Sequence, residues 1–365
     1  MSLKAGIVGL PNVGKSTLFN AITKKNILVA NYPFATIEPN VGIVTVPDER
    51  LGHLEEIYIP EELKPATFEF VDIAGIVKGA SLGEGLGNKF LSHIREVDAI
   101  VEVVRCFDDK EITHVDGNVD PIRDVEVINL ELALADLEII NNRIDKIKKK
   151  AETTKEKETV LEYNALTKAK EALEKDIPLR LVDFTKDEMF AIKGFNFLTL
   201  KPHIYLANIS ENEIKLENDY VKKLKEYAKG ENSKVIVVSA KIESELAELE
   251  DSDKEEMLNE LGIEKSGLDK LIEESYNLLG LKTYFTCGPK EVKAWTYKDG
   301  MNAKECAGII HSDFEKGFIK AEVISYNDLI EAGSELKVKE NGKFRIEGKE
   351  YLMQDGDICH FRFNL

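Results

Sequence analysis

A glycine-rich segment near the start of the chain carries the clearest chemistry in the sequence. It reads Gly9-Leu10-Pro11-Asn12-Val13-Gly14-Lys15-Ser16, which matches the Gly-x-x-x-x-Gly-Lys-Ser pattern of a phosphate-binding loop. The glycines let the backbone curl so that successive N–H groups point at phosphate oxygens, beside the positive end of a following helix. We predict that Lys15 contacts the β- and γ-phosphates and that the Ser16 hydroxyl binds Mg²⁺.

The residues on either side provide the strand and the helix that such a loop requires. Lys4 to Val8 is a short apolar run that suits a buried parallel strand, and Ser16 to Ile22 is compatible with a helix. A chance match in a glycine-containing turn is the alternative, and these flanking elements argue against it. The remaining loop residues expected to contact a nucleotide are Asn12, Val13, Gly14 and Thr17.

Two further segments extend the predicted phosphate and metal site. The loop Asn31 to Pro39 contains Thr36, whose hydroxyl is a candidate second protein ligand of Mg²⁺, although an isolated Thr is often only a loop residue. The apolar strand Phe68 to Asp72 ends in a carboxylate suited to binding Mg²⁺ through water. The Gly75 N–H that follows can meet the γ-phosphate, and the glycine-dense stretch to Gly87 is typical of a switch loop.

The sequence Asn208-Ile209-Ser210-Glu211 follows a predicted strand, His203 to Ala207, where the base of a nucleotide is expected. Guanine-specific P-loop proteins generally carry Asn-Lys-x-Asp here, and the Asp accepts hydrogen bonds from the guanine N1–H and 2-amino groups. Ile209 replaces the Lys, and Glu211 is one methylene longer than Asp. Asn208 can still bond the adenine N7 and 6-amino group, so we predict ATP in preference to GTP. The rest of the loop around the base is expected from Ser239, Ala240 and Lys241.

The order of elements predicts an α/β fold with a mainly parallel sheet, because strands such as Ala99 to Arg105 and Lys234 to Val238 alternate with helices. Residues 1–124 and 199–280 are expected to form a P-loop nucleotide-binding domain. Residues 125–198 are expected to form an inserted helical domain, a coiled-coil hairpin of two antiparallel helices. Its seam is predicted from two sets of apolar residues spaced by seven: Leu130, Leu137 and Ile144, and Ala133, Ile140 and Ile147.

Residues 281–365 are expected to form a separate α+β domain of ubiquitin-like (β-grasp) proportions. One helix, Ala303 to Ile310, is predicted to pack on a small mixed sheet. The predicted strands are Thr283 to Thr286, Val292 to Tyr297, Ile319 to Ile324 and Ile358 to Phe363, with possible short strands at Lys337 to Arg345 and Lys349 to Leu352.

Composition limits the class of protein. The chain has 365 residues and a net charge of −18, which argues against nucleic-acid binding by the surface as a whole. DNA is not an expected partner. No apolar run approaches the roughly 20 residues of a membrane span, and the four cysteines lack metal-site spacing. We expect a cytoplasmic protein without a membrane partner. The lysine run from Lys146 to Lys157 is either a solvated helix end or a contact for RNA or an acidic partner.

With these motifs in order, the chain resembles the translation-factor class of P-loop GTPases, and more closely the Obg-related YchF family, the Obg-like ATPases. The resemblance is carried by the phosphate loop, Tyr32 to Thr36, Asp72 to Gly75, the glycine-rich stretch and Asn208 to Glu211, and residues 281–365 are similar to a TGS domain. It implies an ATPase that also accepts GTP, binds the ribosome or its large subunit, and acts in translation or stress regulation. The TGS and helical domains are then the expected ribosome or RNA contacts.

Hydrolysis also needs an oriented water. Many relatives place Gln directly after Asp-x-x-Gly, but this chain has Ile76, which cannot orient water. We therefore expect slow intrinsic turnover or another catalytic residue beside Lys15 and Gly75. His114 is the candidate, because it matches a His in this family and has a suitable pKa range; a surface-loop histidine is the alternative. Asn12 matches the position that helps hold K⁺ in potassium-stimulated members of the superfamily, so K⁺ is a possible second cofactor.

Three alternative functions stay open from the sequence. A GTP-specific GTPase would contradict the prediction about the base. A metabolic kinase could use the same phosphate loop, but it would need an acceptor pocket and a lid that the sequence does not locate. A nucleotide-independent RNA or ribosome adaptor would use only the C-terminal and helical domains.

Overall fold

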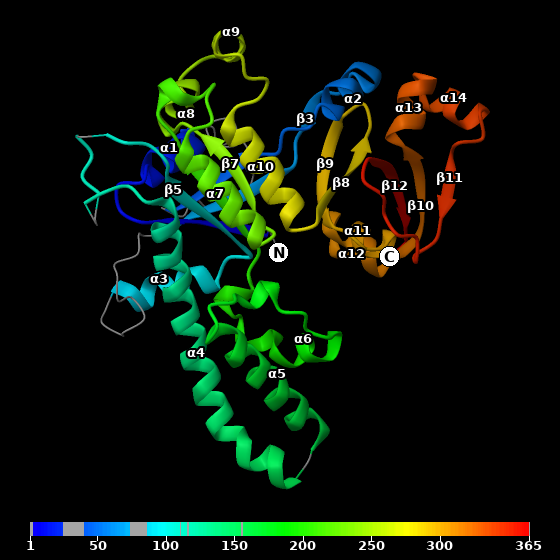
Figure 1. Cartoon of the computed structure of the whole chain (residues 1–365). Coiled ribbons are helices and arrows are strands. Elements are labelled where there is room, and N and C mark those ends of the chain that lie inside the picture. Colours follow the sequence, from blue (N-terminus) through cyan, green and yellow to red (C-terminus); the bar gives the residue numbers. More distant parts are fainter. Residues whose placement is uncertain are drawn as a thin grey trace. The chain divides into compact units, whose positions relative to one another are not determined.

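A computed structural model describes residues 3–24, 40–73, 86–109, 111–114, 117–154 and 156–364 of the protein (Figure 1). Contacts along the backbone divide the chain into two compact units. The first joins Met1–Gly42 with Glu69–Lys270, and the second joins Ile43–Phe68 with Leu271–Leu365. These units follow packing, and they place residues 43–68 with the C-terminal part of the chain. The domain boundaries expected from the sequence stay a prediction.

A six-stranded sheet forms the centre of the first unit, and it confirms the expected α/β fold. Its strands lie in the order β2, β4, β1, β5, β6, β7, and the pairs β1–β4, β1–β5, β5–β6 and β6–β7 are parallel. Every residue of β5 and β6 is buried, which explains why these strands are mostly apolar, and Glu102 and His203 are buried as a pair with His203 Nε2 2.9 Å from a Glu102 carboxylate oxygen. The strands are β1 (Lys4–Gly9), β2 (Val41–Thr45), β4 (Thr67–Asp72), β5 (Ala99–Arg105), β6 (His203–Asn208) and β7 (Lys234–Val238).

Helices surround this sheet. On one face, α7 and the beginning of α4 bury Val125, Val221 and Leu224 against β5 and β6. Short 3₁₀ turns occupy Leu179–Leu181, Lys193–Phe195, Leu198–Leu200 and Glu211–Glu213. The helices of the unit are α1 (Lys15–Lys24), α3 (Leu86–Arg95), α4 (Pro121–Thr154), α5 (Lys157–Leu173), α6 (Lys186–Ile192), α7 (Asp219–Gly230), α8 (Ala240–Leu246), α9 (Asp251–Leu261) and α10 (Gly267–Leu278).

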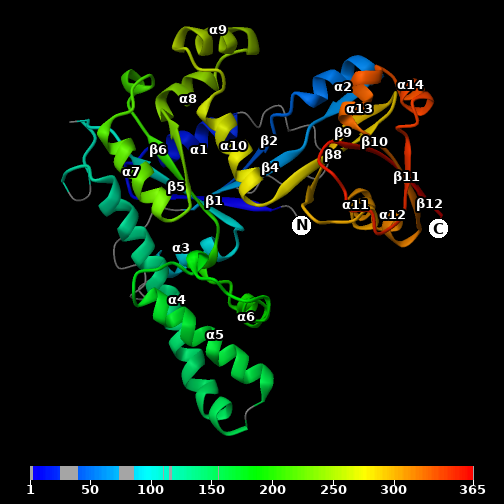
Figure 2. The ribbon, with the colours of Figure 1, turned by 45° about the vertical axis from the view of Figure 1, so that its right-hand side comes forward.

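Helices α4 and α5 lie side by side and project away from the sheet in both views of the ribbon (Figure 1, Figure 2). Ile140 and Ile147 of α4 are buried against Leu166 and Leu173 of α5, as the seven-residue spacing predicts. Leu130 is an exception, because its side chain is 51% exposed. The 17-residue α5 is half as long as the 34-residue α4, so the first half of the predicted seam has no partner in α5.

A buried carboxylate attaches α4 to the chain that returns to the sheet. Asp136 is fully buried and accepts hydrogen bonds from the backbone N–H groups of Leu198 and Thr199 at 3.0 and 2.8 Å, and from the Thr199 hydroxyl at 2.8 Å. Burial raises the pKa of Asp136, although these hydrogen bonds oppose the shift. The base of the helical pair is therefore held by a satisfied polar contact and not by apolar packing alone.

The second unit contains its own six-stranded sheet, ordered β11, β10, β12, β8, β9, β3. Strand β3 (Glu62–Lys64) comes from the N-terminal part of the chain and pairs in parallel with β9 (Glu291–Lys298). The other strands are β8 (Leu281–Cys287), β10 (Phe318–Ser325), β11 (Arg345–Glu347) and β12 (Asp357–Phe363). The helices are α2 (Arg50–Tyr58), α11 (Ala303–Ile310), α12 (Ser312–Lys316), α13 (Tyr326–Ala332) and α14 (Glu335–Glu340).

Two expectations for the C-terminal segment are wrong. The stretch from Lys337 to Arg345 is not one short strand, because it contains the end of α14 and the first residue of β11. The Ser334 side chain accepts a hydrogen bond from the Lys337 N–H and starts this helix despite the alternating Lys and Val pattern. Residues 349–352 form only an isolated bridge between Leu352 and Asn302.

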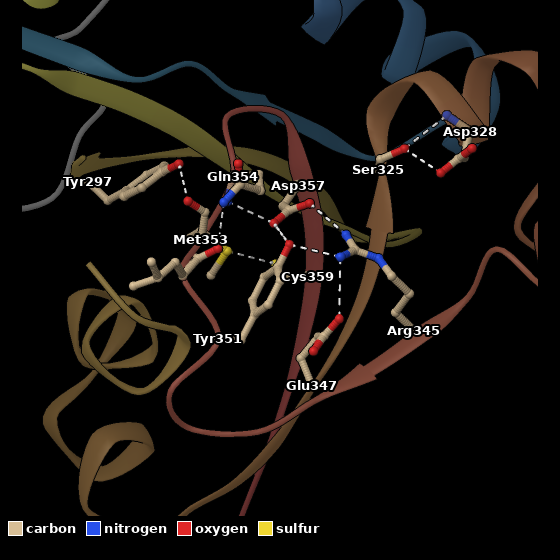
Figure 3. Close-up of polar contacts among 11 residues, drawn as sticks. Tyr297, Ser325, Asp328, Arg345, Glu347, Tyr351, Met353, Gln354, Asp357 and Cys359 are labelled. Atoms are coloured by element: carbon tan, nitrogen blue, oxygen red, sulfur yellow. Dashed lines mark hydrogen bonds and ion pairs between the residues drawn. The ribbon is translucent and has the colours of Figure 1, made fainter. Parts of the chain in front are cut away.

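A second buried carboxylate fastens the segment between β11 and β12 (Figure 3). Asp357 is 1% exposed and accepts hydrogen bonds from the Tyr351 hydroxyl at 2.8 Å, the Gln354 N–H at 3.0 Å and the Arg345 guanidinium at 3.2 Å. Burial raises the pKa of Asp357, and the hydrogen bonds and Arg345 oppose the shift. The small C-terminal sheet is thus closed by a polar network as well as by its apolar core.

Within the described ranges, no helix combines the length and the apolar character needed to cross a membrane. The same part of the chain contains no cluster of three or more His, Cys, Asp or Glu side chains arranged to hold a metal ion.

Candidate functional site

The carboxyl ends of five parallel strands bring the predicted site residues to one edge of the first sheet. Strand β1 leads into the phosphate loop at Gly9, β4 ends at Asp72, and β6 ends at Asn208. Between them β5 ends at Arg105, and β7 precedes Ser239. In open α/β sheets this edge is where ligands bind, so the topology gathers segments that lie far apart in the sequence.

The backbone of the phosphate loop adopts the curled conformation that its glycines allow. Asn12 and Gly14 have φ angles of +63° and +94°. A Cβ at Gly14 would lie 2.3 Å from Asn208 Nδ2, and one at Gly9 would lie 2.9 Å from the Val103 carbonyl oxygen. Both glycines are therefore required by close approach, and Gly14 is also required by its left-handed backbone.

The loop opens directly into α1, whose first turn carries the two residues with the clearest chemistry. Lys15 and Ser16 are the first residues of this ten-residue helix, and no acidic residue occupies its first turn. The ammonium of Lys15 forms an ion pair with the carboxylate of Asp72 at the end of β4. A cation, a carboxylate and the positive end of a helix thus meet at one point, with Ser16 in the same first turn, and phosphate binding uses such a helix start.

Asn208 fixes the phosphate loop relative to α8. Its side chain is 3% exposed; Nδ2 donates a hydrogen bond to the Val13 carbonyl at 2.8 Å, and Oδ1 accepts one from the Ala240 N–H at 2.9 Å. The expected contact of Asn208 with adenine stays a prediction. In the structure, both ends of the amide already bind the protein, so a base could use only the remaining donor or lone pair.

The other residues predicted to surround the base differ in environment. Glu211 forms an ion pair with Lys241 at 2.5 Å, and the hydrogen bond that the ammonium donates to the Glu211 carboxylate raises the pKa of Lys241. Both side chains are at least one-third exposed. Ile209 is 3% exposed and packs in the core with residues of α7 instead of facing this loop. The Ser239 hydroxyl is buried and has no hydrogen-bond partner among the described residues.

His114 directly follows Thr113, whose carbonyl is hydrogen-bonded to the phosphate loop. Asn12 Nδ2 donates a hydrogen bond to the Thr113 carbonyl at 3.1 Å. The His114 ring is 6% exposed, and its Nε2 lies 2.8 Å from an oxygen of Asp124 in the first turn of α4. His114 is therefore a buried, oriented imidazole and not the surface-loop histidine that the sequence left as the alternative.

Several predicted site residues lie outside the described residues. These are Thr36 and Gly75, together with Ile76 and most of the glycine-rich stretch. Their roles stay predictions. The proposed K⁺ contact of Asn12 also stays a prediction; its Nδ2 binds Thr113, which leaves the side-chain oxygen as the atom for a cation.

Two residues at this edge were not expected from the sequence. Asp124 orients His114, and Arg105 is almost completely buried at the end of β5. Arg105 had a detectable signal, because a charged residue closes a strand that is otherwise nearly all apolar. Asp124 had none, since an acid in the first turn of a helix ordinarily serves the helix dipole.

Comparison with family models places two regions of the chain. Residues 4–168 match the model described as a 50S ribosome-binding GTPase. Residues 281–364 match the model named YchF-GTPase_C, which is described as a protein of unknown function.

Curated relatives match the whole chain. The "Ribosome-binding ATPase YchF" of Bacillus subtilis is 60% identical, with all of both chains covered. The proteins of the same name from Haemophilus ducreyi and Escherichia coli O157:H7 are 54% and 51% identical, again with all of both chains covered.

Solved structures agree with this result. The YchF GTPase of Schizosaccharomyces pombe has a TM-score of 0.91 and 43% identity, with 99% of this chain and 98% of that chain covered. A GTP-binding protein from Pyrococcus horikoshii has a TM-score of 0.62 at 22% identity, covers 99% and 100% of the two chains, and shows a likeness of fold alone.

The two buried hydrogen bonds of the Asn208 side chain, to Val13 and Ala240, which we call the Asn208 brace, yield a stability prediction. Asn208→Ala leaves the Val13 carbonyl and the Ala240 N–H without a partner, and orphaned buried groups cost about 1–3 kcal/mol each. We expect the free energy of unfolding of the first unit to fall by about 2–4 kcal/mol in urea titrations. Asn129→Ala is the control, because that amide donates a longer, only partly buried hydrogen bond of 3.3 Å to the Tyr227 hydroxyl. Its loss should therefore lower the free energy of unfolding by less. Equal losses in the two variants would contradict the brace.

Proposed function

Because the chain belongs to the YchF family and is a P-loop nucleoside-triphosphate hydrolase, we propose that it hydrolyses ATP in preference to GTP and acts as a nucleotide-controlled switch on the ribosome. The names of its relatives include both ATPase and GTPase, and the curated relatives are called ribosome-binding. One observation carries the choice of ATP: Glu211, at the sequence position of the guanine-binding Asp, is paired with Lys241.

The phosphate end of the site supports hydrolysis with Mg²⁺. Hydroxyl and carboxylate oxygens are the ligands that Mg²⁺ prefers, and Ser16 and Asp72 supply them at the same edge of the sheet. Ser16 would bind the ion directly and Asp72 through water, and the bound ion would neutralise phosphate charge. The Lys15 ammonium, which forms an ion pair with Asp72, would bind the β- and γ-phosphates, and the loop N–H groups would bind them as well. Thr36 and Gly75 remain proposed partners of the metal and the γ-phosphate.

The base end of the site supports a preference for adenine. Guanine recognition needs a free carboxylate that accepts from both N1–H and the 2-amino group. Glu211 has the longer side chain and is bound to Lys241. Guanine could bind Glu211 only after this ion pair breaks. Breaking an exposed ion pair costs little, typically 0–1 kcal/mol, so guanine is disfavoured but not excluded. We therefore propose a moderate preference, with GTP as a secondary substrate.

Direct titration tests this preference. We expect fluorescent ADP to bind about tenfold more tightly than fluorescent GDP, which corresponds to ~1.4 kcal/mol. Glu211→Asp should narrow the difference, because the shorter carboxylate restores the Asn-x-x-Asp spacing. Asp253→Glu on α9 is a surface control that should leave both affinities unchanged. A clear preference of the wild-type chain for GDP would rule out the argument about the base and leave a GTP-specific GTPase.

The buried His114 supports a role in orienting the attacking water. The Asn12 side chain ties the preceding Thr113 to the phosphate loop, and Asp124 holds one ring nitrogen. A carboxylate that fixes an imidazole in one orientation is a common arrangement for a general base. Ile76 cannot supply this function, so we propose His114 as the catalytic residue.

Substitution of the histidine tests the proposal. His114→Ala should lower kcat on the order of 10²–10⁴-fold, while the affinity for ADP stays within twofold. Asp124→Asn should give a smaller loss, because the ring remains but its preferred tautomer changes. His360→Ala, an exposed histidine on β12, should have the activity of the wild type. A His114→Ala protein with unchanged kcat would contradict the proposed catalytic role of His114.

The ribosome is the proposed partner because relatives that match over their full length carry that name. The helical pair α4–α5 and the C-terminal sheet are the proposed contact elements. Several lysines near the end of α4, Lys148 to Lys150, are exposed, which suits phosphate contacts. A ribosomal partner places the protein in the cytoplasm. The alternative of a nucleotide-independent adaptor would use the same surfaces.

Sedimentation with ribosomes separates a switch from an adaptor. We expect the pelleted fraction to be severalfold higher with a non-hydrolysable ATP analogue than with ADP. Lys15→Ala should remove this difference, because it deletes the phosphate-binding ammonium, while residual ribosome binding remains. Equal pelleting of the wild-type chain with the ATP analogue, ADP and no nucleotide would favour the adaptor.

A further inference from the structure

A buried arginine closes β5 beside the candidate site and has no part in the function proposed so far. The Arg105 side chain is 1% exposed. Its three described hydrogen bonds all end on backbone carbonyl oxygens: Nε donates to Phe107 at 3.1 Å, Nη1 to Ile112 at 3.0 Å and Nη2 to Asp109 at 3.2 Å. The guanidinium also lies over the Phe107 ring, 4.8 Å from its centroid.

These contacts hold one short stretch of chain, residues 106–109 and 111–114, which we call the His114 segment. A buried cation is costly unless its donors are satisfied. Here the planar fork of the guanidinium satisfies carbonyls at three points of the segment at once, and a lysine ammonium could not copy that geometry. The segment is therefore folded around the guanidinium.

The far end of the His114 segment is held by groups of the site itself. Asn12 binds the Thr113 carbonyl, and Asp124 binds the His114 ring. The near end is also fixed, because the Cys106 N–H donates to the Asn208 carbonyl at 2.8 Å and the Cys106 carbonyl accepts from Asn218 Nδ2 at 2.8 Å. Between these two ends Arg105 holds the chain at three carbonyls from a buried position, and the Tyr220 hydroxyl adds one exposed contact with Asp108 at 2.9 Å.

We propose that Arg105 is a positioning residue for hydrolysis, which holds the His114 segment so that the imidazole lies beside the phosphate loop. This inference rests on the proposed role of His114. Arg105 pairs in register with Asn208 on β6, so the strand ends that fix the imidazole and the phosphate loop are adjacent. A purely structural arginine would instead support the sheet without any effect on the catalytic step.

The test uses Arg105→Lys in the full chain, which keeps the charge and removes the fork. We expect kcat to fall roughly tenfold to a hundredfold, since small misplacements of a catalytic group have effects of this size. The KM for ATP and the affinity for ADP should stay within twofold. Hydrogen–deuterium exchange should rise in the peptide that contains Phe107 and Ile112.

Arg180→Lys is the matched control. Arg180 is another largely buried arginine of the first unit, bound to Glu231 at 2.5 Å. Its replacement should lower the melting temperature without changing kcat or the exchange of the His114 segment. If Arg105→Lys behaves like Arg180→Lys, with wild-type kcat and exchange, the positioning role is overturned.

A double mutant separates this inference from the proposed function. If Arg105 acts through His114, the variant with both Arg105→Lys and His114→Ala should be no slower than His114→Ala alone. Multiplied losses would overturn the inference while His114 keeps its role. Wild-type kcat in His114→Ala would refute the proposed catalytic role itself.

Phe107→Leu covers the case in which Arg105→Lys fails to fold. It leaves the guanidinium and removes the ring beneath it. We expect a severalfold loss of kcat and faster exchange of the same peptide, with ADP affinity unchanged. A folded Phe107→Leu protein with wild-type kcat and exchange would count against the inference.

Discussion

The side-chain amide of Asn208 holds the nucleotide-binding edge together. Its nitrogen binds the phosphate loop at Val13, and its oxygen binds the first residue of α8, Ala240. Both contacts are buried, where an unsatisfied polar group is costly. The phosphate loop and the beginning of α8 therefore cannot move independently. The close approach at Gly14, which leaves no room for a Cβ, follows from the same contact.

The proposed phosphate and base ends of the site are built from interactions of very different strength. The phosphate loop is shaped by buried hydrogen bonds and by glycines that no other residue could replace. Glu211 and Lys241, which we propose to face the base, form an exposed ion pair that is weak and easily rearranged. On this proposed assignment, small changes at the Glu211–Lys241 pair would alter the preferred base and leave the phosphate loop intact.

The sequence predicted the elements whose signal is local. Strands β1, β4, β5, β6 and β7 and helix α11 formed where apolar runs or helical periodicity placed them, because buried positions, at every residue of β5 and β6 and at alternate residues near the start of β4, leave a direct mark on composition. Leu130 shows the limit of periodicity: the seven-residue spacing was real, but the partner helix is too short to cover it. At Lys337, a single serine cap outweighed an alternating pattern, since propensity over so short a stretch is a weak signal.

By itself, the sequence determined the class of chemistry. A phosphate loop between a strand and a helix has a geometry set by eight neighbouring residues, so Gly9 to Ser16 were sufficient to predict it. Only the tertiary structure decided what surrounds that loop. In that structure Ile209 lies in the core, and the Asn208 amide connects the phosphate loop to α8. His114 is buried against Asp124, and the neighbouring segment is hydrogen-bonded to Arg105. These outcomes depend on distances between groups that lie far apart in the chain, and no local pattern encodes such distances.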